Sequence, residues 1–202
     1  MTQPILSEEQ IAKLDSIARL GADKIAGSLS KWVKTDIASG KAGASIVHYS
    51  KLLEPLADPE DIVAAIIIKV SGSVAGYLIF LFDEMSAKQI VARVLRRKVD
   101  SISDWDDLSR SVMEETGNII GSAFLNTLAA NLNLEIHPSS PVMACDFAGA
   151  FLDTMMAQHA MEGEYALTCQ ITFTSPPDKI SGNEISGTFA MLPDNIDAWK
   201  QL

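Results

Sequence analysis

The chain has 202 residues, of which 48% are hydrophobic and 21% charged, and its formal net charge is −10 at pH 7. This length allows a hydrophobic core, and the acidic balance argues against sequence-independent binding of nucleic acid and against docking on anionic lipid. Cys145 and Cys169 are too few for a disulfide scaffold and have no CxxC spacing. The start, MTQPILSEEQ, lacks the features of a signal peptide. We therefore expect one soluble, cytoplasmic domain over residues 1–202.

The first half of the chain predicts one long helix followed by strands. Ser7 is a plausible N-cap, because acidic and amide residues occupy the next turn and an apolar stripe follows at helical spacing. The most apolar stretch of the chain is interrupted by Ser71-Gly72-Ser73, which favours a hairpin over a membrane helix. The expected elements are a helix over Leu6–Lys34 and strands over Ala44–Tyr49, Ile62–Val70 and Val74–Phe82.

The second half repeats this order after a shorter helix. Ser103 or Asp104 lies near the N-cap of a second long helix, which ends near residues 131–133. Pro138 and Pro141 lie inside the extended stretch that follows, so that stretch is an edge strand or a strand with a bulge. The other expected elements are helices over about 84–98 and Phe151–Ala160 and strands over Leu134–Phe147, Tyr165–Thr174 and Ile185–Leu192.

This order suggests an internal duplication, with half-repeats over about 7–83 and 103–194. The hairpin segments 74–83 and 185–194 align with a shared glycine and a shared final aspartate. Two hairpins can also look alike from their apolar pattern alone. A duplicated unit predicts an α+β fold, in which two long helices occupy equivalent positions on one mostly antiparallel sheet.

The second long helix carries a polar group along one face. At about 100° per residue, Ser111, Glu115, Asn118 and Ser122 fall within a narrow arc. We call Ser111, Glu115 and Asn118 the polar triplet. The residues expected on the opposite, sheet-facing side are Trp105, Leu108, Val112, Ile119 and Ala123.

Polar residues at this spacing are most often a solvated helix face. Gly117, Asn118 and Gly121 are nevertheless poor helix formers, and a face serving solubility alone favours Glu, Lys, Gln or Ala. Small neighbours would leave the Asn118 amide accessible to the backbone of a partner. The competing interpretation is that the glycines allow close packing of the helix.

The polar triplet has no nucleophile, and the three histidines, His48, His137 and His159, are scattered along the chain. The sequence contains no metal-ligand spacing and no phosphate-binding glycine loop. A carboxamide can hold a water in line for attack, as a glutamine does in some GTPases, and a carboxylate can pair with a partner's lysine. Such chemistry needs a partner that supplies the phosphoryl group and its Mg²⁺, and no cofactor or metal of the chain's own is expected.

The spacing of these residues resembles the signature of the CheC, CheX and FliY phosphatases of bacterial chemotaxis. That signature is [D/S]-x-x-x-E-x-x-N, then 22 residues and a proline; here it is Ser111, Glu115, Asn118 and Pro141. The element order and the duplicated halves extend the resemblance over residues 8–194. The resemblance implies a CheC-like fold and hydrolysis of the aspartyl phosphate of a phosphorylated CheY-like response regulator.

The resemblance also implies a role for each residue. Glu115 forms a salt bridge to a lysine of the regulator, and Asn118 enters its active site and orients the attacking water. Ser111 supports them, and Pro141 shapes the strand beside the helix.

In family members with two sites, the first long helix carries the same signature. Here the overlay places Asp15, Arg19 and Ala22 at its three positions, and no proline follows at the matching distance. Because Arg19 would repel the regulator's lysine and Ala22 cannot hold a water, we expect this first site to be degenerate.

The alternative function is a non-catalytic adaptor of the same fold that binds a response regulator or the receptor deamidase CheD. A further hypothesis is an adaptor protein without any link to phosphorelay. CheD and a second copy of the chain, paired through the sheet, are further candidate partners. Mg²⁺ is expected on the regulator alone.

Overall fold

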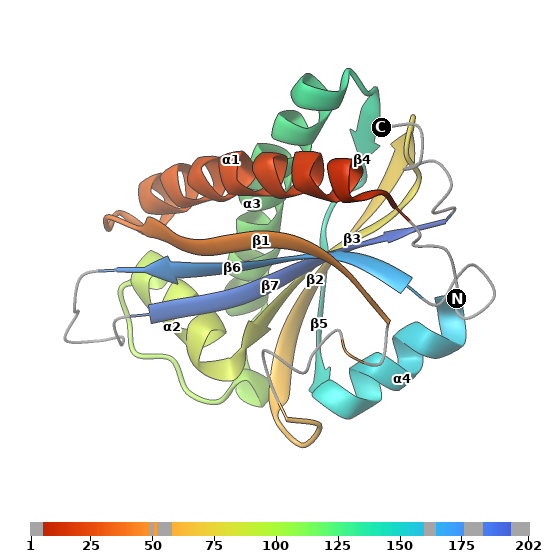
Figure 1. Cartoon of the computed structure of the whole chain (residues 1–202). Helices are drawn as coiled ribbons and strands as arrows, with labels where there is room; N and C mark the ends of the chain where they lie inside the picture. The colour runs from red at the N-terminus through yellow and green to blue at the C-terminus, as the bar shows by residue number, and fades with distance from the viewer. Residues whose placement is uncertain (1–5, 49–50, 52–57, 160–164, 176–183, 195–202) are drawn as a thin grey trace.

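The computed structural model describes residues 6–48, 51, 58–159, 165–175 and 184–194. Its centre is a seven-stranded antiparallel sheet with the order β1-β6-β7-β3-β2-β4, and β5 pairs with the same edge of β2 as β4 (Figure 1). The elements in chain order are α1 (Glu8–Val33), β1 (Ala38–His48), β2 (Ile62–Gly72), β3 (Gly76–Asp83), α2 (Glu84–Leu95), the 3-10 helix η2 (Ile102–Asp104), α3 (Asp107–Leu132), β4 (Ile136–Pro138), β5 (Val142–Phe147), α4 (Ala148–His159), β6 (Tyr165–Thr174) and β7 (Glu184–Pro193).

The two long helices, α1 and α3, each have 26 residues and similar ends. Ser7 caps α1 in a capping box with Gln10, and the Asp106 carboxylate caps α3 by accepting from the Ser109 N–H. Both helices end at a residue in the left-handed conformation, Lys34 after α1 and Asn133 after α3. The caps therefore define equivalent positions along the two helices.

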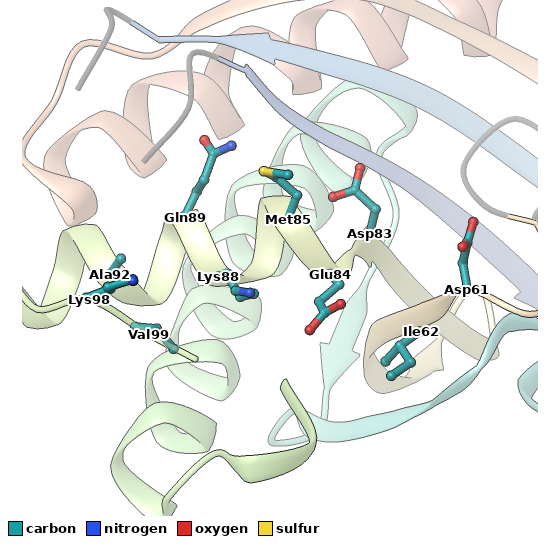
Figure 2. Close-up of a pocket in the computed structure, with 10 residues that line it drawn as sticks. All are labelled: Asp61, Ile62, Asp83, Glu84, Met85, Lys88, Gln89, Ala92, Lys98 and Val99. Atoms are coloured by element: carbon teal, nitrogen blue, oxygen red, sulfur yellow. The ribbon is translucent and has the colours of Figure 1, made fainter. Parts of the chain in front are cut away.

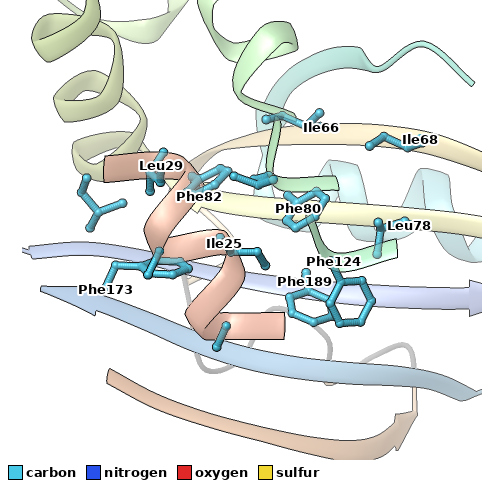
Figure 3. Packing of buried hydrophobic residues seen from close by; sticks show 14 of the residues in the cluster. Ile25, Leu29, Ile66, Ile68, Leu78, Phe80, Phe82, Phe124, Phe173 and Phe189 are labelled. Carbon is cyan, nitrogen blue, oxygen red and sulfur yellow. The ribbon is translucent and has the colours of Figure 1, made fainter. Parts of the chain in front are cut away.

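Alternation along the strands divides the core into two layers. Ile66, Phe80 and Phe189 point to the face that carries α1, α2 and α3, and the rings of Phe124 and Phe189 lie 4.3 Å apart between their centroids (Figure 3). The opposite face packs against α4 through Phe151 and residues such as Leu81. The polar triplet therefore belongs to a helix that has the sheet on one side only.

The strand order agrees with an internal duplication. Exchanging β1, β2 and β3 with β5, β6 and β7 turns the order β1-β6-β7-β3-β2-β5 into its own reverse. The centre of this reversal lies between β3 and β7, which are paired antiparallel. The predicted α+β class, with two long helices on a mostly antiparallel sheet, is confirmed.

Several boundaries differ from the predicted ones. β1 begins at Ala38 instead of Ala44, because its small residues pair with β6 from Ala38 onward, while Tyr49 lies outside the described residues. The predicted strand over Leu134–Phe147 is two edge strands, β4 and β5, separated at Pro141. α2 ends at Leu95, because Arg96 takes a left-handed conformation. α4 begins at Ala148, and Ala160 is outside the described residues.

Candidate functional site

The polar triplet lies on the solvent-facing side of α3. Ser111, Glu115 and Asn118 are all exposed, and Ser122 is partly exposed one turn further on. Within the described part of the chain, no hydrogen bond or ion pair engages the side chain of any member of the polar triplet. The carboxylate and the carboxamide, three residues apart, can therefore both meet a partner.

The buried side of α3 differs from the predicted one. Leu108 is 57% exposed, so the prediction for this residue is wrong, whereas Ile119 and Ala123 are partly buried and Ala123 packs against the core. The buried face is instead made of Ser109, Val112, Met113, Thr116, Gly117, Ile120, Gly121, Phe124, Leu125 and Leu128. The apolar pattern was misleading because several of these core positions hold glycine or hydroxyl residues.

The two glycines of α3 face the sheet and not the solvent. A Cβ on Gly117 would overlap the Cγ2 methyl of Ile66, and one on Gly121 would lie 2.5 Å from Ile68 Cδ1. The glycines therefore let α3 pack closely on β2, as the competing interpretation proposed. As a result, the helix backbone beside Asn118 lies directly against the sheet, while the Asn118 side chain is exposed.

A buried hydroxyl links the back of the site to the first helix. Thr116 Oγ1 donates to the Val112 carbonyl at 2.7 Å and accepts from Trp32 Nε1 at 2.9 Å. Thr116 is fully buried and lies between Glu115 and Gly117 in sequence. This contact between α1 and α3 opposes rotation of α3 about its axis, and the sequence alone did not indicate it.

The start of α3 is held by a second polar group. The Asp106 carboxylate accepts from Ser109 Oγ at 2.6 Å and from Arg97 Nη2 at 2.7 Å, and Arg97 also donates to Ser109. These bonds, with the Ser109 N–H, hold the pKa of the Asp106 carboxyl well below its usual range. Arg97 follows α2, so this contact fixes α3 relative to α2.

Pro141 lies immediately before β5, at the point where the sheet edge changes from β4 to β5. Ser139 bridges this break, because its N–H donates to the Lys69 carbonyl and its hydroxyl accepts from the Lys69 N–H. Since α3 contacts both β4 and β5, the proline lies in the strand segment beside the helix.

The first helix lacks an equivalent pair of side chains, but the predicted overlay is shifted. Ala22 is buried at 1% exposure, so its position cannot correspond to the exposed Asn118. Asp15 accepts from Arg19 Nε at 2.9 Å and from the Ala44 N–H at 3.0 Å, and these bonds lower its pKa. The Asp15 side chain is therefore engaged in holding α1 against β1.

Matching the N-caps of the two helices, Ser7 and Asp106, residue by residue gives a corrected overlay. It aligns the exposed residues Ala12, Ser16 and Arg19 with Ser111, Glu115 and Asn118, in that order. Neither a carboxylate nor a carboxamide occupies the two key positions of α1. A sequence comparison anchored on the two N-caps would have found this register.

The pocket in Figure 2 lies beside α2, and no member of the polar triplet lines it. It has a volume of about 470 Å³. Glu84 is engaged there in the fold, since its carboxylate accepts from Ser101 Oγ and the Ile102 N–H and thereby holds η2. The lining residues are Asp61, Ile62, Asp83, Glu84, Met85, Lys88, Gln89, Ala92, Lys98 and Val99.

Among the described residues, no cluster of three or more His, Cys, Asp or Glu side chains is arranged to bind a metal ion. None of the helices within the described ranges has the length and apolar character needed to cross a bilayer. The side chains of Cys169 and His159 are outside what the structure describes. The polar triplet is thus the candidate group of functional side chains that the structure describes on this face of α3.

Known proteins resemble the chain in sequence and in fold. The sequence is 25% identical over 199 residues to the CheY-P phosphatase CheC of Bacillus subtilis (strain 168), covering 98% of this chain and 93% of that protein. The fold matches Thermotoga maritima FliY with a TM-score of 0.72 at 13% identity, over 98% of this chain and 97% of FliY. No protein-family model matches the chain.

Two solved complexes contain chains of the same fold. A chain of the FliG–FliM complex from H. pylori matches with a TM-score of 0.69 at 11% identity, over 98% of this chain and 100% of that chain. A chain of the CheX–CheY–BeF3–Mg+2 complex from Borrelia burgdorferi matches with a TM-score of 0.52 at 21% identity, over 86% and 96% of the two chains. The chain is thus similar in sequence to a CheC protein, and its fold is that of the FliY chain and of chains in the two complexes.

Proposed function

We propose that the chain hydrolyses the aspartyl phosphate of a phosphorylated CheY-like response regulator. The observation that carries this proposal is that Glu115 and Asn118 project together from α3 while no other described side chain engages them. The similarity to a CheY-P phosphatase supports the choice of substrate. Such a substrate agrees with the predicted location in the cytoplasm.

In this proposal Asn118 places the attacking water. Its carboxamide oxygen accepts a hydrogen bond from the water, and its NH₂ group donates to a neighbouring acceptor, so the water lies in line with the bond to be broken. The water oxygen attacks phosphorus as the bond from phosphorus to the aspartyl oxygen breaks. Inorganic phosphate and the regulator's carboxylate are the products, and the regulator supplies the Mg²⁺ that stabilises the transferring group.

Glu115 fixes the position of the partner. A carboxylate one turn before Asn118 can pair with a cationic side chain beside the regulator's phosphoryl group. Ser111 extends the same face by another turn, and Pro141 supports the edge strand beside α3. Because Glu115 is exposed, its ion pair should contribute on the order of 0–1 kcal/mol to binding.

Phosphate release from the regulators of the source genome, phosphorylated beforehand, tests both roles. Asn118→Ala should lower turnover by about 100-fold with little change in affinity, because the water loses its alignment. Glu115→Ala should raise the Kd by up to about fivefold and change the turnover less. Asn126→Ala is the matched control, since Asn126 is also exposed on α3 but lies two turns beyond Asn118. Full activity of Asn118→Ala would contradict the water-positioning role.

The second candidate function is a non-catalytic adaptor that binds a regulator or another chemotaxis protein. Two observations favour it: α1 lacks the Glu and Asn pair, and the fold also matches a chain of the FliG–FliM complex. Binding of a phosphorylated regulator without faster phosphate release from the wild-type protein would select the adaptor. CheD and a second copy of the chain stay predicted partners that pull-down with purified CheD and sedimentation can test.

A further inference from the structure

One directional contact joins the helix that carries the polar triplet to the first helix. Trp32, near the end of α1, donates from Nε1 to Thr116 Oγ1 at 2.9 Å. That hydroxyl donates in turn to the Val112 carbonyl at 2.7 Å, so its proton and one of its acceptor sites are both engaged. Thr116 is fully buried and directly follows the exposed Glu115. The bond therefore holds the same helix turn that presents the carboxylate.

Two buried contacts hold α3 on different sides of its axis. At about 100° per residue, Thr116 lies about 100° around the axis from Glu115, and Gly117 lies about 200° from it. Thr116 meets α1 through its hydroxyl, and Gly117 meets β2 through the Ile66 side chain. The apolar contact has no preferred direction, whereas a hydrogen bond weakens steeply as its angle departs from linearity. The bond from Trp32 is therefore the contact of the two that defines the rotation of α3.

Rotation of α3 would move the side chains that project from it. A carboxamide stands about 6 Å from the axis of its helix, so rotation by about 10° displaces it by about 1 Å. A displacement of about 1 Å can lower the rate of an oriented reaction by up to about 100-fold. An exposed ion pair tolerates such a shift, because its attraction in water depends weakly on distance. Rotation should thus disturb the water held by Asn118 more than docking through Glu115.

We propose that Trp32 and Thr116 are positioning residues, which set the rotation of α3 and thereby align Asn118 with the phosphoryl group of the regulator. The inference rests on the proposed function, because it concerns turnover at the same site. Both residues act through the orientation of α3 and not by contact with the reacting atoms. The bond also gives α1, which contains no asparagine, a part in the reaction at α3.

The kcat of phosphate release and the Kd for a CheY-like regulator loaded with beryllofluoride and Mg²⁺ test this role. Thr116→Val removes the acceptor but keeps a branched side chain of similar size, and Trp32→Phe removes the donor but keeps an aromatic ring. Each should lower kcat by about tenfold and change the Kd less than about twofold. Thr116→Ser keeps the hydroxyl and should restore most of kcat. The double variant should be about as slow as either single variant, because the two changes remove one shared bond.

Thr168→Val is the matched control for the loss of a buried threonine hydroxyl. Thr168 is 4% exposed, and its hydroxyl bonds to the hydroxyl and the carbonyl of Ser45 on the neighbouring strand. Thr168 shares its face of β6 with Ala166, which packs in the core layer on the side of α4. The control should unfold at a lower urea concentration than the wild type but keep its kcat.

The outcomes separate the positioning role from the proposed function. Wild-type kcat in Thr116→Val and Trp32→Phe, an equal loss of kcat in Thr168→Val, or a raised Kd in place of a lowered kcat would overturn the positioning role and leave the phosphatase proposal intact. Circular dichroism verifies the fold of each variant, and Trp32→Phe decides the question if Thr116→Val does not fold. Wild-type protein that binds the loaded regulator but releases no phosphate would overturn the proposed function, and the positioning role with it.

Discussion

Gly117 lies at the closest approach of α3 to β2, directly before the Asn118 that the proposal places in the partner. In an exposed helix, replacing glycine by alanine stabilises by up to about 1 kcal/mol. At this position the added methyl group would overlap Ile66, and we expect Gly117→Ala to destabilise the protein by about 1–3 kcal/mol. Urea unfolding followed by circular dichroism measures the difference.

Gly27 is the matched control, because it is exposed in α1 and a Cβ there would have no heavy atom within 4 Å. Gly27→Ala should stabilise the protein by up to about 1 kcal/mol. Pairing Gly117→Ala with Ile66→Ala should cost less than the sum of the two single changes, because they share one contact. Strict additivity would indicate that the methyl group of Ile66 does not limit the approach of α3.

The sequence predicted exposure of the polar triplet correctly but not that of Leu108. Polar residues at spacings of four and three are a direct signal of a shared face, and that signal does not depend on what packs behind the helix. The buried face of α3 contains Thr116 and two glycines. Thr116 accepts a hydrogen bond from Trp32, and the glycines lie where β2 passes close to the helix. Contacts between distant segments decide such positions, so local periodicity misassigned them.

The first turn of α3 depends on the charge of one side chain. The usual pKa of an Asp carboxyl is 3.8, and the bonds from Ser109 and Arg97 lower that of Asp106 in the folded protein. A lowered folded pKa means that the carboxylate adds stability above the unfolded pKa, and that this stability is lost as the pH falls through the folded value. The helix should therefore loosen at its start in acid.

Asp106→Asn tests this dependence, because asparagine is also a good N-cap but does not titrate. At neutral pH the variant should unfold at a lower urea concentration than the wild type, since Arg97 loses its ion pair. The gap between the two proteins should narrow as the pH falls from about 5 to about 2. A gap that stays constant over this range would show that the carboxylate charge does not stabilise α3.

At the scale of elements, the order of helices and strands was predictable, and the ends were less so. Ser7 indicated the start of α1, because a hydroxyl followed by an amide three residues later is a strong local signal. β1 begins six residues earlier than expected, since the small residues after Ala38 owe their extended form to β6, which is distant in sequence. Strand boundaries depend on pairing, whereas helix caps are local.

The whole molecule has two long helices of equal length on a sheet whose strand order reverses onto itself, and of these two helices only α3 carries the Glu and Asn pair. If the halves are equivalent in space, the corrected overlay predicts where a second site can be introduced. Ser16→Glu with Arg19→Asn would place a carboxylate and a carboxamide on the exposed face of α1. In an Asn118→Ala background, this pair should raise phosphate release about tenfold above that background.

The register predicted from sequence supplies the control for this design. Arg19→Glu with Ala22→Asn follows that register, but Ala22 is buried, so the amide would lose its water and destabilise the protein by about 1–3 kcal/mol. Recovery of phosphate release with the first pair and loss of stability with the second would support equivalence of the two helices. The opposite pattern would show that the caps of α1 and α3 do not mark equivalent positions, and that the α1 face differs from the site by more than two side chains.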